Sequence, residues 1–120
     1  MAVRKPGQIV VFRFPQTNLN KGKLRPALLL APVPGKYEDW LCCMISTKLY
    51  HAITGFDEII DKNSPDFNAC GLKISSVVRV ARLAVVTGEV LVGTLGEISF
   101  ERFKCIQDNL ASWIHGKTQT

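Results

Sequence analysis

Residues 7–31 read GQIVVFRFPQTNLNKGKLRPALLLA, and this stretch decides how the chain is expected to fold. Its first half, residues 8–14, is dense in β-branched and aromatic side chains, whereas residues 26–31 form a short apolar run typical of a buried strand. The residues between these runs include proline, asparagine and glycine, which supply turn geometry. The segment therefore predicts two strands joined by an exposed loop that ends at Arg25.

The expected loop is basic, because Lys21, Lys23 and Arg25 all lie on it. An arginine at the rim of a loop between strands is a place to hold phosphate, and a solvated hairpin loop without a ligand is the alternative. The first 37 residues hold seven Lys or Arg and no Asp or Glu, whereas the other 83 hold eight basic and ten acidic residues. This uneven charge indicates an anionic partner, for which RNA, DNA, an acidic protein segment and a membrane surface are candidates.

The length and composition fit one globular domain over residues 1–120, since 47% of the 120 residues are hydrophobic. No apolar run approaches the roughly 18 residues of a membrane span, and Arg13 interrupts the N-terminal run. We therefore expect no signal peptide and no membrane insertion, and a cytoplasmic protein. The four cysteines lack the paired CxxC spacing of a zinc site, which favours reduced, structural thiols.

Further short strands are expected near residues 40–46, 56–60, 77–83 and 90–95, a pattern that favours a small antiparallel barrel. The proline and asparagines of residues 62–68 predict a loop. The apolar period then changes, and a C-terminal helix is expected, capped by Ser99 and ended by Gly116. Trp113 falls in the apolar stripe of that helix, so we expect it to pack in the core.

The order of five segments carries a family resemblance: GQIVVFRFPQTN, LRPALLL, CCMISTK, GLKISSVVRVARL and, before the helix, LGEIS. From about Gly7 to the terminal helix, the chain resembles the MazF/PemK (Kid) family of toxin endoribonucleases. The resemblance implies a mainly β fold, a small SH3-like antiparallel barrel with a C-terminal α-helix, usually a homodimer. It implies cleavage of single-stranded RNA at short sequences without a metal or other cofactor, and a cognate antitoxin whose acidic tail covers the RNA groove.

Cleavage of RNA without a metal uses the ribose 2′-hydroxyl as nucleophile, so the protein must take one proton, give another and stabilise a phosphorane. A guanidinium suits the third task, because it offers five fixed donors and stays charged. The family keeps its active site at the Arg-Pro that opens the second strand and at the Ser/Thr pair that ends the third. The resemblance therefore assigns catalysis to Arg25, Ser46 and Thr47, although the two hydroxyls would also serve as turn-forming groups.

Three departures from the family pattern bear on the chemistry. Ser46 stands where the family usually has threonine. Kid-like members carry Arg-x-Asp in the strand that here contains Arg79, and Ala81 stands at the carboxylate position. The obvious general base is thus missing, so a weak or inactive enzyme is an open alternative. Gln8 replaces the aspartate of many relatives and is assigned no role. His51 would supply a base if its loop folded back, but an exposed loop histidine is the favoured interpretation.

RNA contacts are expected from amides and cations of the basic loop and from two arginines of residues 77–83, namely Gln16, Asn18, Asn20, Lys21, Lys23, Arg79 and Arg82. A non-catalytic member of the same fold is the alternative. One version is a gyrase poison like CcdB, for which the residues after Trp113 are a poor match. The other is a degenerate relative that binds RNA or an antitoxin without cutting.

Overall fold

The structure, a computed structural model, describes residues 3–13 and 23–116. Its strands, in chain order, are β1 (Gln8–Arg13), β2 (Leu24–Pro32), β3 (Asp39–Ser46), β4 (Glu58–Ile60), β5 (Ser76–Thr87) and β6 (Leu91–Glu97). Its helices are α1 (Phe67–Cys70) and α2 (Phe100–Ile114), with single 3₁₀ turns η1 (Leu49–His51) and η2 (Gly88–Val90). All six expected strands are therefore confirmed as elements of a mainly β fold.

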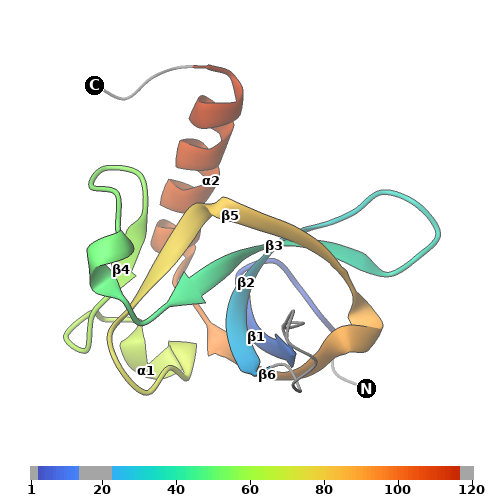
Figure 1. Cartoon of the computed structure of the whole chain (residues 1–120), viewed down its shortest axis with the longest axis horizontal. Coiled ribbons are helices and arrows are strands. Elements are labelled where there is room, and N and C mark those ends of the chain that lie inside the picture. Colours follow the sequence, from blue (N-terminus) through green and yellow to red (C-terminus); the bar gives the residue numbers. More distant parts are fainter. Residues whose placement is uncertain (1–2, 14–22, 117–120) are drawn as a thin grey trace.

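One antiparallel sheet in the order β4-β5-β3-β2-β1-β6 contains every described strand. The sheet curls strongly, and β5 crosses in front of β3 while β1, β2 and β6 lie together below (Figure 1). Within the described part of the chain, β4 and β6 are its edges and do not pair with each other. Closure into an SH3-like barrel is therefore not observed.

The short helix α1 packs against the edge strand β6 through two glycines. A Cβ atom added at Gly96 would lie 2.0 Å from the Ala69 carbonyl oxygen, and one added at Gly71 would lie 2.1 Å from that of Leu95. A Cβ atom would clash with the carbonyl oxygen at either distance, so both positions require glycine. The expectation of a loop over residues 62–68 is wrong for its last two residues, because Phe67 and Asn68 form the beginning of α1. A helix of only four residues is not stable alone, so α1 depends on this contact with β6.

Alternating side chains divide the core between the two faces of the sheet. The first apolar cluster consists of Ile9, Leu28, Leu30, Cys43, Ile45, Ile60, Cys70, Val78, Val80, Ile98 and Ile106. The second apolar cluster consists of Val10, Phe12, Ala27, Leu29, Trp40, Cys42 and Leu91, with Met44, Ala84 and Val86 packed against it. Adjacent cysteines of β3 thus face opposite sides. Burial raises the pKa of Cys42 to about 11, which keeps this thiol protonated.

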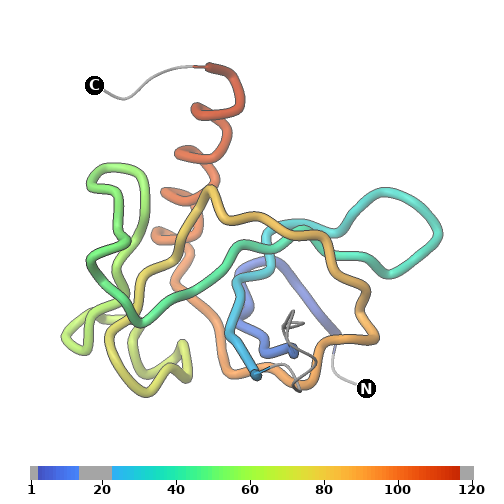
Figure 2. Tube along the Cα trace, viewed as in Figure 1, coloured from blue at the N-terminus to red at the C-terminus, as the bar shows by residue number. Residues whose placement is uncertain are grey.

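Helix α2 covers the first apolar cluster. Ser99 caps it as expected, since its hydroxyl accepts a hydrogen bond from the Arg102 backbone N–H at 3.2 Å, and Gly116 follows its end. The expectation that Trp113 packs in the core is wrong, because the residue is 48% exposed and makes an edge contact with Phe56. The C-terminal end of α2 projects beyond the sheet (Figure 2).

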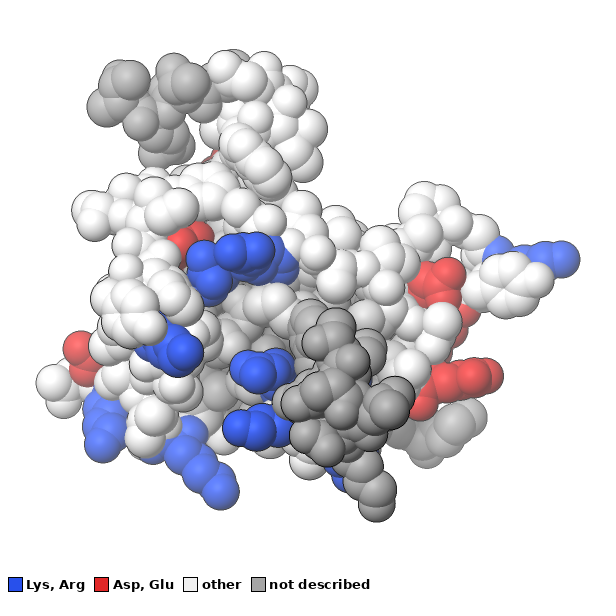
Figure 3. All heavy atoms as spheres, viewed as in Figure 1, with Lys and Arg blue, Asp and Glu red and all other residues white. Residues whose placement is uncertain are grey.

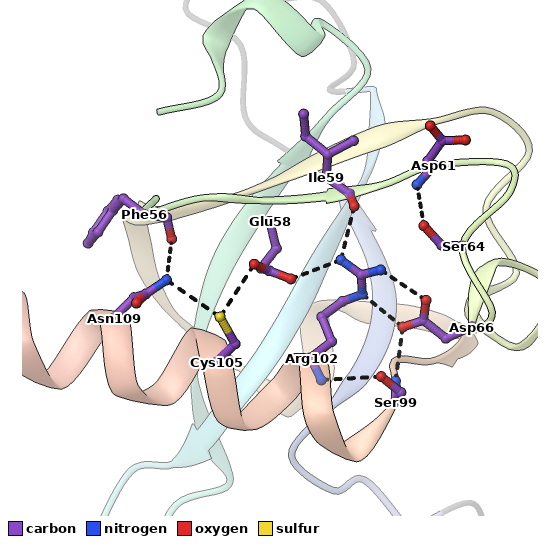
Figure 4. Close-up of polar contacts among 10 residues, drawn as sticks. All are labelled: Phe56, Glu58, Ile59, Asp61, Ser64, Asp66, Ser99, Arg102, Cys105 and Asn109. Atoms are coloured by element: carbon purple, nitrogen blue, oxygen red, sulfur yellow. Dashed lines mark hydrogen bonds and ion pairs between the residues drawn. The ribbon is translucent and has the colours of Figure 1, made fainter. Parts of the chain in front are cut away.

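Arg102 ties the first turn of α2 to β4 and to the turn before α1 (Figure 4). Its Nε donates to Asp66 Oδ2 at 2.8 Å, and its Nη1 donates to Glu58 Oε1 and to the Ile59 carbonyl oxygen, both at 3.0 Å. Burial raises the pKa of Asp66, but hydrogen bonds from Arg102 and from the Ser99 N–H outweigh it, so the net shift is downward from 3.8. This charged group fixes how the helix sits on the sheet.

In the described residues, no helix combines the length and the apolar character that crossing a membrane requires.

Candidate functional site

Arg25 and Ser46 lie on the adjacent strands β2 and β3 and line the same hollow. The pairing of these strands ends at Ala27 and Met44, and each of the two residues lies two positions beyond that pair. Because side chains alternate along a strand, Arg25 shares the face of Ala27, and Ser46 shares the face of Met44. Both residues thus lie on the side of the second apolar cluster, at its open end.

Strand β5 brings two more arginines to the same place. Arg79 pairs with Met44, whereas Leu83 pairs with the preceding Cys43, so residues 80–82 form a bulge without partners on β3. The bulge lets Arg82 approach the residues around Arg79. We call the resulting hollow the cationic cavity, of about 300 Å³, lined by Arg25, Met44, Ile45, Ser46, Lys48, His51, Arg79 and Arg82.

The cationic cavity carries uncompensated positive charge. Four of its lining residues are basic, and none of those described is an aspartate or glutamate. The ion pairs found among the described residues all involve other cations, namely Lys5, Arg102 and Lys104. Basic side chains gather over the centre and left of this face, while most of the acidic ones lie toward its rim (Figure 3). Converging cations without partners form a site for an anion.

Ser46 combines a structural contact with a free donor. Its Oγ accepts a hydrogen bond from the Lys48 backbone N–H at 3.0 Å, which begins the turn after β3. A hydroxyl carries one proton besides its acceptor sites, so this contact leaves the proton of Ser46 available for a ligand. The Ser46 hydroxyl can therefore stabilise the turn and donate a hydrogen bond to a ligand at the same time.

The same turn folds His51 back into the cationic cavity. The His51 N–H donates to the Lys48 carbonyl oxygen at 3.0 Å within η1, and the ring of Tyr50 contacts the imidazole edge-on. Partial desolvation and the charges of Arg79, Lys48 and Arg82 lower the pKa of His51 below 6.5. The favoured expectation of an exposed loop histidine is wrong. The cause is the turn that follows Ser46, which reverses the chain within five residues and is not evident from the sequence.

A second hollow, also of about 300 Å³, adjoins the cationic cavity and shares Arg79 and Arg82 with it. Ala81, which stands at the family's carboxylate position, lines this hollow together with Asp57. The Asp57 carboxylate oxygens accept backbone N–H groups of Ile53 and Val80, each at 2.9 Å. Asp57 therefore anchors the segment after η1 to β5.

Two of the other predicted site residues are described by the structure and lie outside the cationic cavity. Thr47 and Lys23 are exposed and do not line it, so their roles stay predictions. Gln16, Asn18, Asn20 and Lys21 lie outside the described residues. Among the residues that the structure describes, no three His, Cys, Asp or Glu side chains are placed to hold a metal ion together.

Comparison with known families places this arrangement in context. Residues 5–114 match the model of the family described as PemK-like, MazF-like toxin of type II toxin-antitoxin systems. The chain belongs to this family of toxins, whose members are known as endoribonucleases. A search of curated proteins finds no match.

Solved structures share the fold at low sequence identity. MazF (Form-I) from Deinococcus radiodurans is 20% identical, with a TM-score of 0.68 over 96% of this chain and 99% of that one. The Mycobacterium tuberculosis toxin MazF-mt6 is 15% identical, with a TM-score of 0.66 over 90% of this chain and 96% of that one. An endoribonuclease from a mycobacterial species, solved with its cognate antitoxin, is 13% identical, with a TM-score of 0.63 over 98% and 100% of the two chains. At these identities, the likeness concerns the fold.

Proposed function

We propose that this chain is the toxin of a toxin–antitoxin pair, a sequence-selective endoribonuclease that cleaves single-stranded RNA by attack of the ribose 2′-hydroxyl, without a metal. The cationic cavity carries the proposal. It is lined by the Arg25 guanidinium and the Ser46 hydroxyl, from adjacent strands, and by three further cations that take part in none of the ion pairs found among the described residues. A phosphodiester supplies the negative charge that this cavity lacks.

Arg25 and Ser46 act on the scissile phosphate. The N–H groups of the Arg25 guanidinium donate hydrogen bonds to the non-bridging oxygens. These hydrogen bonds become stronger as the phosphorane develops additional negative charge. The Ser46 hydroxyl donates its free proton to one of the same oxygens, while its oxygen keeps the bond from the Lys48 N–H. Arg79, Arg82 and Lys48 hold the neighbouring phosphates of the strand. Thr47 and the basic loop before Arg25 are proposed to contact RNA outside the cavity.

The proposed partners follow from the charge and from the exposed apolar surface. An antitoxin with an acidic tail complements the cationic cavity, and several of the similar solved structures are toxin–antitoxin complexes. A second copy of the chain is proposed to cover apolar side chains of β5 and β6, where Val85 and Val92 are each 60% exposed.

The test is incubation of the purified protein with end-labelled single-stranded RNA in EDTA. The proposal predicts discrete fragments that end in 2′,3′-cyclic phosphate. RNA that stays intact under all conditions would contradict it.

A non-catalytic RNA binder is the second candidate, favoured by Ala81 at the position of the family's carboxylate. It predicts retention of intact RNA, with log Kobs falling against log[salt] at a slope of about −3 if four phosphates are contacted. Product formation separates the two candidates, because both predict salt-sensitive binding.

A further inference from the structure

We propose that His51 is the general base of this site and takes the proton of the attacking 2′-hydroxyl. The inference rests on the proposed ribonuclease function. It goes beyond Arg25, Ser46 and Thr47, to which the family resemblance assigns catalysis, because His51 lies outside every motif quoted for that resemblance.

His51 lies beside the proposed phosphate-binding residues. His51 lines the same cavity of about 300 Å³ as Arg25 and Ser46, so a phosphodiester bound to those two residues lies within reach of the imidazole. The ring is held by the 3₁₀ turn η1 and by the edge contact with Tyr50, at 4.5 Å between ring centroids. A general base must lie close to the proton that it accepts. The turn η1 holds the imidazole beside the cavity, where the 2′-hydroxyl of a bound RNA would lie.

His51 has no competitor as a proton acceptor among the described residues that line the cavity. Besides His51, the described side chains that line the cavity are cations, one hydroxyl and apolar groups, none of which accepts a proton readily near neutral pH. The carboxylate of the Kid-like branch is replaced by Ala81. The nearest carboxylate on this side, Asp57, lines the adjoining hollow, and its oxygens are engaged by backbone N–H groups.

The electrostatic surroundings keep the imidazole neutral until RNA arrives. Arg79 and Arg82 face it from β5, Lys48 from its own turn and Arg25 from β2, while Asp57 and Tyr50 are the other titratable groups nearby. Partial desolvation and the cations lower the pKa of His51, so at pH 7 the ring is uncharged and free to accept a proton. A bound phosphodiester offsets the cations and raises this pKa toward neutrality, where general bases are most effective.

In the proposed step, the 2′-oxygen forms a bond to phosphorus while its proton moves to the imidazole. The Nδ1 atom of His51 is buried and has no hydrogen-bond partner among the described residues, so Nε2 is assigned to accept the proton. The bond from phosphorus to the 5′-oxygen then breaks, and solvent water supplies a proton to that oxygen. The products are a 2′,3′-cyclic phosphate and a 5′-hydroxyl, and the imidazolium returns its proton to water.

The first experiment compares single-turnover rates of the full chain and of His51→Gln between pH 4.5 and 8.5. Loss of a general base is expected to slow cleavage by about 100-fold or more and to remove the rise of the rate with pH. His115→Gln, which alters the chain's other histidine, is the matched control and keeps the original rate and profile. Equal rates and profiles for His51→Gln and the unmodified chain would overturn the inference and leave the proposed function standing.

The second experiment does not depend on cleavage. The ring proton resonances of His51 are titrated by NMR with and without a 2′-deoxy oligonucleotide, which lacks the nucleophile and stays intact. The inference predicts a pKa of His51 that rises when the oligonucleotide binds. A His51 titration that does not respond would overturn the inference. Failure of the unmodified chain to cleave any RNA would instead overturn the proposed function, and the assigned step with it.

Discussion

Arg25 of β2 and Ser46 of β3 line one cavity, each two residues beyond the Ala27–Met44 pair with which the ladder between these adjacent strands ends. Their spacing is thus determined by strand register and not by the packing of a loop. Sites built on paired strands hold their geometry well, which suits a reaction that relies on donors aimed at one phosphate.

The hydroxyl of Ser46 is predicted to contribute to cleavage separately from its role in the turn. Ser46→Ala removes the donor to the phosphate and is expected to lower the single-turnover rate by about 100-fold. It also frees the Lys48 N–H, at a cost of about 1 kcal/mol in the free energy of unfolding. Ser46→Thr keeps the hydroxyl and should retain most of the activity. An alanine variant as fast as the threonine variant would remove Ser46 from the mechanism.

The contact of α1 with β6 is predicted to require a residue without a side chain at position 96, which is Gly96. Gly96→Ala places a Cβ 2.0 Å from the Ala69 carbonyl oxygen and is expected to lower the free energy of unfolding by about 2 kcal/mol. Gly93→Ala, in the same strand, meets no atom within 4 Å and serves as the control. Urea denaturation measures both changes. Equal stability of the two variants would show that the helix does not sit on the strand as described.

Arg102 is predicted to be the most important ion-pairing residue for stability among those described. Arg102→Met leaves the Asp66 carboxylate, whose side chain is 6% exposed, without its cation, and we expect a loss of about 3 kcal/mol. Lys104→Ala breaks only the exposed pair with Asp108 and should cost about 0.5 kcal/mol or less. Denaturation midpoints at pH 7 that fall equally for both variants would contradict this ranking.

The same ion pair predicts a loss of stability in acid. The folded-state pKa of Asp66 lies below its ordinary value of 3.8, because the hydrogen bonds from Arg102 and the Ser99 N–H outweigh the burial that raises it. Its contribution is therefore complete above pH 3.8 and is lost as the pH falls through the folded-state pKa. The stability gap between the unmodified chain and Arg102→Met should narrow between pH 5 and pH 2, as measured by denaturation. A gap that is independent of pH would exclude this origin.

The strands could be predicted because their β-branched runs are punctuated by turn residues. Helix α2 could be predicted because Ser99, a three- and four-residue apolar period and Gly116 all agree on one element. The position of Arg25 beside Ser46 needed the family resemblance, since register between strands is not visible in either segment alone.

Other features depend on contacts between distant segments, so the sequence did not show them. Helix α1 exists through the close approach of Gly71 and Gly96 to neighbouring backbone, and neither glycine is distinctive in the sequence. Trp113 belongs to the apolar stripe of α2, but the helix extends beyond the sheet, so this side chain stays partly exposed. His51 enters the cavity because Ser46 initiates a turn and Asp57 anchors the following segment, two side-chain contacts that no local pattern encodes.

The role of Arg25 in cleavage is tested by the single-turnover rate of Arg25→Ala on a single-stranded RNA in EDTA, beside Lys36→Ala as a control for the loss of one exposed cation. If the Arg25 guanidinium stabilises the phosphorane, the Arg25 variant should cleave about 100- to 1,000-fold more slowly, while the Lys36 variant keeps the original rate. An Arg25→Ala protein that folds normally and cleaves at the original rate would contradict the account.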